Sequence, residues 1–180
     1  MSHHVMIDLE TWGAGNYAVP ISIGAVKFDP AKSESEWSTF HIAVDPESAM
    51  KAGLRADAET ILWWMDDTRR EALHCWYRLE RVDLTSALDG FATWFGAESL
   101  PVWGNGATFD NVILRNAFIA AGQDCPWKFW HDRCFRTMKA LPGARELEPR
   151  RAGTHHDALD DALHQARHLI RIVEHFNLTL

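Results

Sequence analysis

The first 44 residues contain three apolar segments that are separated only by short turns. These segments cover residues 4–9, 21–28 and 37–44. The second segment ends at Asp29-Pro30 and the third at Asp45-Pro46, and such dipeptides are typical of turns. The third segment also alternates between apolar and polar side chains, as a half-buried strand does. Three strands joined by short turns predict an antiparallel meander.

The rest of the chain has mainly helical periodicity. Apolar side chains recur at helical spacing over residues 59–65, 85–95, 109–121 and 157–176, and residues 101–103 form a short strand candidate. A meander followed by alternating helices and strands predicts an α/β fold in which helices cover a mixed sheet. Residues 142–153 are rich in Pro, Gly and Arg, and we expect them to be the least regular part of the fold.

Length and composition are typical of a single domain over residues 1–180. The chain is 47% apolar, which is enough for a substantial core, and no internal repeat or linker divides it. Three scattered cysteines indicate reduced thiols, and no apolar run approaches the roughly 20 residues that span a bilayer. The N-terminus also lacks a signal-peptide pattern, so we expect a cytoplasmic protein with no membrane partner.

The formal charge of −7 bears on the class of partner. A protein that grips long nucleic acid without specificity usually has a basic surface, so the charge argues mildly against that class. It does not exclude an enzyme whose acidic site is neutralised by cations.

Asp8 and Glu10 are the first residues that indicate chemistry. Side chains two positions apart on a strand project from one face, so both carboxylates would lie together while Leu9 faces the other way. Burying two carboxylates without a partner is costly, and a hard cation such as Mg²⁺ or Mn²⁺ would offset that cost because it prefers oxygen ligands. For an isolated pair, a solvated strand end is the simpler explanation.

Two further acidic segments open predicted helices. Residues 105–110 precede the helix over 109–121, and residues 155–161 place two histidines and three acids at the start of the last helix. Acids at a helix N-terminus often cap it, which would explain Thr108 or Asp110 without catalysis. The second segment has more such residues than capping requires.

Together the three segments resemble the motifs of the DnaQ-like, or DEDDh, exonuclease family, which has a ribonuclease H-like fold. The motif Asp-x-Glu-Thr is matched by residues 8–11. The second motif is matched by Asn105, Phe109, Asp110 and Leu114, and the third by His156, Ala158, Asp161 and Ala162. Each motif is weak alone, but their order from residue 8 to residue 162 covers nearly the whole chain and makes the resemblance specific.

The third motif has two possible registers. His155 with Asp160 has the same spacing as His156 with Asp161, but only the second pair places alanines at the matching positions. We therefore choose His156 and Asp161. Asp160 is then expected to be exposed on the helix, and Asp157 is a candidate for an acid that supports the site.

The resemblance implies a metal-dependent 3′-5′ exonuclease. Two divalent cations, Mg²⁺ or Mn²⁺, would be held by the carboxylates of Asp8, Glu10, Asp110 and Asp161. His156 would act as the general base, and the product would be a nucleoside 5′-monophosphate. Substrate-binding candidates beside the first two motifs are Leu9, Thr11, Trp12, Asn105 and Phe109. For Trp12, packing of a loop aromatic under the sheet is an equally good interpretation.

The basic residues are unevenly placed. Seven of the eighteen precede the third motif: Lys128, Arg133, Arg136, Lys139, Arg145, Arg150 and Arg151. Arg150 and Arg151 lie close enough in sequence to the motif to form a phosphate clamp beside the site. A solvated loop is the alternative interpretation.

Residues 59–64, which contain the pair Trp63 and Trp64, bear on which kind of nucleic acid the protein binds. This segment is similar to a branch of the family that contains a mycobacterial exoribonuclease and a phage exodeoxyribonuclease. We favour RNA, as single strands or 3′ overhangs, over single-stranded DNA, with a non-catalytic nucleic-acid-binding module as the third alternative. The two tryptophans are interpreted as core or interface residues, or as a surface that stacks on a base. The resemblance is also compatible with a homodimer.

Overall fold

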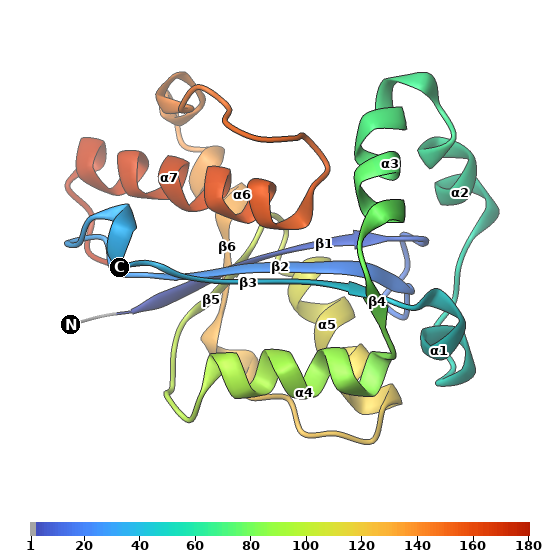
Figure 1. The fold of residues 1–180 in the computed structure, drawn as a ribbon. Coiled ribbons are helices and arrows are strands. Elements are labelled where there is room, and N and C mark those ends of the chain that lie inside the picture. The colour runs from blue at the N-terminus through green and yellow to red at the C-terminus, as the bar shows by residue number, and fades with distance from the viewer. Residues whose placement is uncertain (1–2) are drawn as a thin grey trace.

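The computed structural model describes residues 3–180. Its centre is a six-stranded sheet with the strand order β4-β3-β2-β1-β5-β6 (Figure 1). The strands are β1 His4–Thr11, β2 Pro20–Phe28, β3 Ser38–Val44, β4 Arg81–Val82, β5 Val102–Gly104 and β6 Asp132–Cys134. The first three strands form the predicted antiparallel meander, and the last three pair in parallel with their neighbours. The α/β fold with a mixed sheet is therefore confirmed.

Helices cover both faces of this sheet. They are α1 Pro46–Lys51, α2 Ala58–Trp64, α3 Arg70–Arg78, α4 Leu84–Phe95, α5 Asp110–Ala120, α6 Phe135–Lys139 and α7 Ala158–Phe176. α6 and α7 lie on one face and α4 and α5 on the other, while α2 and α3 stand beside the end of β1 (Figure 1). Among residues 3–180, no helix combines the length and the apolarity that crossing a membrane requires.

The two faces of β1 belong to different cores. Val5, Ile7 and Leu9 pack in the larger core, which contains the apolar faces of α4 and α5. Met6 packs in the smaller core beneath α7. Because side chains alternate along a strand, Asp8 and Glu10 share the α7 face with Met6, as predicted. Both faces of the strand are covered, which explains why it is apolar on both sides.

Helix α7 begins directly over β2 at Gly24. A Cβ atom on Gly24 would lie 2.1 Å from the carbonyl carbon of Ala158, so only glycine permits this contact. Gly24 is also the residue that pairs with Asp8 across β1 and β2. The close approach therefore places the first turn of α7 beside the acidic pair of β1.

Some local features differ from the sequence-based expectations. β1 continues through Glu10 and Thr11, because both residues pair with β2 instead of entering a loop. The helix α3 was not expected, and the irregular region over 142–153 contains the short 3-10 helix Ala144–Leu147. The assignment to one domain and the cytoplasmic location stay predictions.

Candidate functional site

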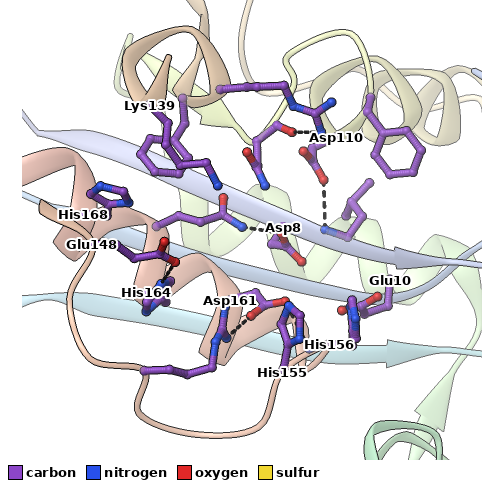
Figure 2. A pocket seen from close by; sticks show the side chains of 17 residues that line it. Asp8, Glu10, Asp110, Lys139, Glu148, His155, His156, Asp161, His164 and His168 are labelled. Carbon is purple, nitrogen blue, oxygen red and sulfur yellow. Dashed lines mark hydrogen bonds and ion pairs between the residues drawn. The ribbon is translucent and has the colours of Figure 1, made fainter. Parts of the chain in front are cut away.

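A pocket of about 290 Å³ lies where β1, α5 and α7 meet. All five predicted metal-binding and catalytic residues line it, namely Asp8, Glu10, Asp110, His156 and Asp161. Figure 2 shows the carboxylates of Asp8, Glu10 and Asp161 directed toward one another, with His156 beside them. The structure thus brings together residues that are up to 153 positions apart in the sequence.

Three of the carboxylates form a tight cluster. Oxygen atoms of Asp8, Glu10 and Asp161 all lie within 4.8 Å of one another. The first two project from β1, and the third is on the first turn of α7. Asp8 is held by α7 as well, because its Oδ1 accepts a hydrogen bond of 2.6 Å from Gln165 Nε2. One helix therefore supplies an acid and orients another.

Asp110 reaches the cluster from the start of α5. Phe109 occupies the N-cap position of that helix, and no side-chain hydrogen bond caps it. The Asp110 carboxylate instead accepts the backbone N–H of Leu9 at 3.2 Å, and the side chain is buried. Asp110 is thus an acid in the first turn of α5, as the simpler interpretation has it, but its carboxylate also makes a long-range contact to β1 that helix capping does not explain.

Burial raises the pKa of three acids of the pocket, namely Asp8, Glu10 and Asp110. Desolvation, followed by the charges of Asp110 and Glu10, raises the pKa of Asp8 well above its ordinary value. Desolvation and the nearby Asp161 do the same to the pKa of Glu10. Desolvation also raises the pKa of Asp110 to about 7. Buried carboxylates of like charge, with oxygen atoms as the only donors, fit a hard divalent cation, which would favour their ionised forms.

His156 lies on the loop that enters α7 and is held by its surroundings. Its backbone is left-handed, with φ +66°, and its N–H donates to Asp161 Oδ2 at 3.1 Å. The imidazole stacks on His155 at 3.9 Å between ring centroids and meets Trp63 edge-on at 5.0 Å. Burial, and then the charge of His155, lowers the pKa of His156. The neutral imidazole, which can accept a proton, is therefore favoured.

The two registers of the third motif have different environments. Asp161 is buried and belongs to the carboxylate cluster. Asp160 was expected to be exposed, but it is half-buried because its carboxylate accepts the Thr154 N–H at 2.7 Å. Asp157 caps α7 by accepting the N–H groups of Leu159 and Asp160. The structure therefore separates these acids into a cluster member, a loop anchor and a helix cap.

The basic segment contributes three residues to the pocket, namely Arg136, Lys139 and Arg151. Arg136 donates to the backbone oxygen of Asn105 at 2.8 Å, and Arg151 forms an ion pair with Asp161 Oδ1. Arg150 is exposed and does not line the pocket. The predicted clamp pair is therefore divided, since only Arg151 points into the site.

The substrate-binding candidates are divided in the same way. Leu9, Asn105 and Phe109 line the pocket, whereas Thr11 and Trp12 do not. Trp12 packs on the larger core and lies 5.4 Å from Trp76 between ring centroids. The interpretation of Trp12 as a packing residue is thus the better one.

The two tryptophans of α2 have different environments, and stacking on a base stays a prediction. Trp64 is buried and donates its indole N–H to the Thr11 carbonyl at 2.9 Å. Trp63 is 38% exposed, and its indole packs against His156. The Arg69 guanidinium lies over the Trp63 ring, 3.8 Å from the ring centroid. Trp64 is therefore a core residue, and Trp63 packs against His156.

Several residues that line the pocket were missed. They are Phe135, Glu148, His164, Gln165 and His168. Gln165 had a usable signal, because it follows Asp161 by four positions and residues so spaced share a helix face. Glu148 had none, since its 2.9 Å contact with His164 Nε2 depends on the path of an irregular loop.

Comparisons with known proteins agree with this geometry. The model of the 3′-5′ exoribonuclease Rv2179c-like domain family matches residues 3–173. The comparison with curated proteins gave no significant match.

Similar solved structures cover nearly the whole chain. The nuclease domain of 3′hExo, a DEDDh family member bound to rAMP, has a TM-score of 0.63 and 14% identity over 97% of this chain and 92% of that chain. E. coli Exonuclease I in complex with a dT13 oligonucleotide has a TM-score of 0.60 and 16% identity, over 97% of this chain and 41% of that chain. The zinc-ion-bound form of the E. coli ExoI–ssDNA complex has a TM-score of 0.59 and 15% identity, over 97% of this chain and 41% of that chain. This chain thus spans 41% of the length of Exonuclease I. At such identities the likeness establishes the fold, which is the predicted ribonuclease H-like fold.

Proposed function

The chain belongs to the family of 3′-5′ exoribonuclease Rv2179c-like domains, and we propose that it is a 3′-5′ exonuclease that releases nucleoside 5′-monophosphates from the 3′ ends of RNA. One observation carries the proposal. The carboxylates of Asp8, Glu10 and Asp161 lie within 4.8 Å of one another in a pocket that Asp110 and His156 also line.

We propose that Asp8, Glu10, Asp110 and Asp161 hold two divalent cations, Mg²⁺ or Mn²⁺. When bound, such cations increase the acidity of a water molecule and stabilise negative charge on the phosphate. The raised pKa values of Asp8, Glu10 and Asp110 support this proposal, because carboxylates buried together need a positive partner to ionise. E. coli Exonuclease I, which is similar in fold, also has a zinc-ion-bound form.

His156 is the proposed general base. As water attacks the last phosphorus atom, an imidazole nitrogen of His156 takes its proton. The bond from phosphorus to the 3′-oxygen of the preceding nucleotide breaks, which leaves the phosphate on the 5′-oxygen of the released nucleotide. The lowered pKa of His156 supports this role, because it keeps the ring neutral before the reaction.

Leu9, Asn105 and Phe109 are the proposed contacts for the terminal nucleotide. They line the pocket beside the acids and offer it two apolar side chains and one amide. The Asn105 Oδ1 atom is buried without a hydrogen-bond partner among the described residues, and we propose that the side chain turns to accept a hydrogen bond from the substrate. Thr11 contacts the site only indirectly, because its carbonyl accepts the indole N–H of Trp64, whose ring centroid lies 6.0 Å from that of His156.

RNA is the preferred substrate in this proposal. The family name and the rAMP bound to 3′hExo support RNA. The second candidate is single-stranded DNA, which is favoured by the structural similarity to Exonuclease I in its complex with dT13. The two substrates differ in the 2′-hydroxyl group, so direct comparison of matched strands decides between them.

The test is a product assay with Mg²⁺ or Mn²⁺. Single-stranded RNA, an RNA duplex with a 3′ overhang, and single-stranded DNA of the same sequence are labelled at the 5′ end. We expect a ladder that shortens from the 3′ end and is fastest on RNA. Asp8→Asn should abolish it, and His156→Ala should slow it by about 10²- to 10⁴-fold.

The variants need a control for folding. Asp124→Asn removes one exposed carboxylate outside the pocket, and it should cleave like the wild type. If the protein shortened DNA faster than RNA, single-stranded DNA would be the preferred substrate instead of RNA. If folded wild-type protein shortened no strand with either cation, the assignment as an enzyme would be wrong and a non-catalytic nucleic-acid-binding module would take its place.

A further inference from the structure

Both oxygen atoms of Asp161 are occupied within the protein. Oδ1 forms an ion pair with the Arg151 guanidinium, and Oδ2 accepts the backbone N–H of His156. The Asp161 side chain is 9% exposed and that of Arg151 is 31% exposed. Asp161, one of the carboxylates that the proposed function assigns to a cation, is therefore already engaged in a partly buried ion pair.

Arg151 is distinct among the basic residues that line the pocket. Within residues 3–180 it alone forms an ion pair with one of the four acids that are proposed to hold the cations. Arg136 is directed to the backbone oxygen of Asn105, and the Lys139 amine lies 5.7 Å from the centroid of the Phe135 ring. Arg151 is thus the internal counter-ion of Asp161.

The position of Arg151 in the chain allows its side chain to move while the acid stays fixed. The loop from Glu148 to Asp157 has neither helix nor strand, and Arg151 lies near its middle. The end of that loop is anchored, because Thr154 donates to Asp160 and His156 donates to Asp161. A long, partly exposed arginine side chain can turn without displacing this anchor.

We propose that Arg151 is an exchangeable counter-ion of Asp161. It neutralises that carboxylate while no divalent cation is bound, and it turns to a phosphate group of the substrate when a cation takes Oδ1. The exchange rests on the proposed function for its two ligands. It makes Arg151 a competitor of the metal and a partner of the nucleic acid.

Opposite effects on the two ligands follow from this exchange. Because the guanidinium and the cation compete for one oxygen atom, removal of Arg151 tightens cation binding. The same change weakens binding of the substrate, because a guanidinium is well suited to bind phosphate. A merely structural role for Arg151 would weaken both, since the site would be less well ordered.

The first measurement is Mn²⁺ binding by calorimetry to purified Arg151→Gln protein without nucleic acid. We expect roughly three- to fivefold tighter binding than in the wild type, the upper part of the range for loss of one partly exposed ion pair. Arg150→Gln is the matched control, because it removes the same charge one residue away and outside the pocket. Its Mn²⁺ affinity should stay within about twofold of the wild type.

The second measurement is the salt dependence of RNA binding in Ca²⁺, which we expect to support binding without cleavage. The slope of log K against log salt should fall by about 0.7 in Arg151→Gln, the value for one phosphate contact on a single strand. Arg151→Lys keeps the charge, and it should retain most of the slope. Thermal melting of each variant shows whether it is folded.

Two results would overturn the exchange. One is Mn²⁺ affinity in folded Arg151→Gln that equals or falls below that of Arg150→Gln. The other is an unchanged salt slope in Arg151→Gln. A wild-type protein that binds no Mn²⁺ would instead overturn the proposed function, so the two failures are distinguishable.

Discussion

The indole of Trp63 meets the imidazole of His156 edge-on, with their ring centroids 5.0 Å apart. Trp64 approaches the same imidazole at 6.0 Å, and His155 stacks on it at 3.9 Å. A histidine on a loop is therefore held by three aromatic rings, two of which come from α2. We infer that α2 orients the proposed base and excludes water from it.

Replacement of Trp63 should change the pH dependence of cleavage. Burial is the main cause of the lowered pKa of His156, so Trp63→Leu should let this pKa rise toward its ordinary value. A base must be unprotonated to act, and the acidic limb of the pH–rate profile should therefore move to higher pH. The rate at the optimum should fall roughly tenfold, because the ring is less well oriented.

Two further variants test this role of Trp63. Trp63→Phe keeps an aromatic edge and should recover most of the rate. Leu62→Ala removes a neighbouring apolar side chain that is 67% exposed, and it should leave the profile in place. A Trp63→Leu enzyme whose acidic limb coincided with that of the wild type would refute the role.

The stability of the metal-free protein should fall as the pH rises. Asp110 has a pKa of about 7 in the fold, and Asp8 and Glu10 are shifted in the same direction. Between about pH 4 and pH 7 the folded state therefore binds more protons than the unfolded state, and the free energy of unfolding decreases with pH. His4, His156 and His168 have the opposite sign, because their lowered pKa values favour the fold as the pH approaches 6.5.

Melting in EDTA between pH 5 and pH 8 checks this prediction. Asp110 alone contributes at most about 2.7 kcal/mol to the difference between pH 5 and pH 8, because only the two pH units between pH 5 and its pKa of about 7 count. Asp110→Asn keeps an oxygen atom for the Leu9 N–H but does not ionise, so it should flatten the curve. Asp124→Asn changes an exposed acid and should leave the shape of the curve unchanged. A wild-type protein that was more stable at pH 8 than at pH 5 in EDTA would contradict the assignment.

Mn²⁺ should reverse this loss of stability. A cation that binds only the folded state adds about 2.7 kcal/mol when its concentration is 100 times its dissociation constant. The gain should be larger at pH 8 than at pH 5, because protonated carboxylates are poor ligands. Asp8→Asn should remove most of it. Equal melting temperatures with and without Mn²⁺ in the wild type would count against a metal site.

Contacts that depend on spacing within one element could be predicted from the sequence. Asp8 and Glu10 share a face because strands alternate, and Asp161 has its place because α7 is regular. Contacts made through irregular segments could not. Arg150 and Arg151 have identical chemistry, and only the path of the loop decides which one reaches the pocket.

Local signals were also ambiguous where tertiary contacts decide the outcome. Asp110 and Asp157 both stand at the start of a helix, yet one accepts an N–H from β1 and the other caps its own helix. The helix α3 was missed because its buried side is narrow, with Ala72 as its one fully buried residue. Its apolar and polar side chains are nevertheless well separated around the helix, so α3 had a signal in the sequence that was overlooked.

Gly24 had a signal in the sequence, because glycine inside an apolar strand often marks the close approach of another backbone. Gly24→Ala would place a Cβ 2.1 Å from the Ala158 carbonyl carbon and 2.3 Å from the Leu159 nitrogen. The first turn of α7 must then move away from β2, at a cost of about 1–3 kcal/mol. Since that turn carries Asp161, we expect weaker Mn²⁺ binding as well as a lower melting temperature.

Gly90→Ala is the matched control for Gly24→Ala. Gly90 lies inside α4, and its added Cβ would meet only the Phe40 ring at 3.7 Å, an ordinary contact distance. Alanine in a helix is favoured over glycine by about 0.5–1 kcal/mol, so this variant should be as stable as the wild type or more so. Melting curves and Mn²⁺ titrations of both variants make the comparison. If Gly24→Ala matched Gly90→Ala in both measurements, the contact between α7 and β2 would not be what places Asp161 beside Asp8.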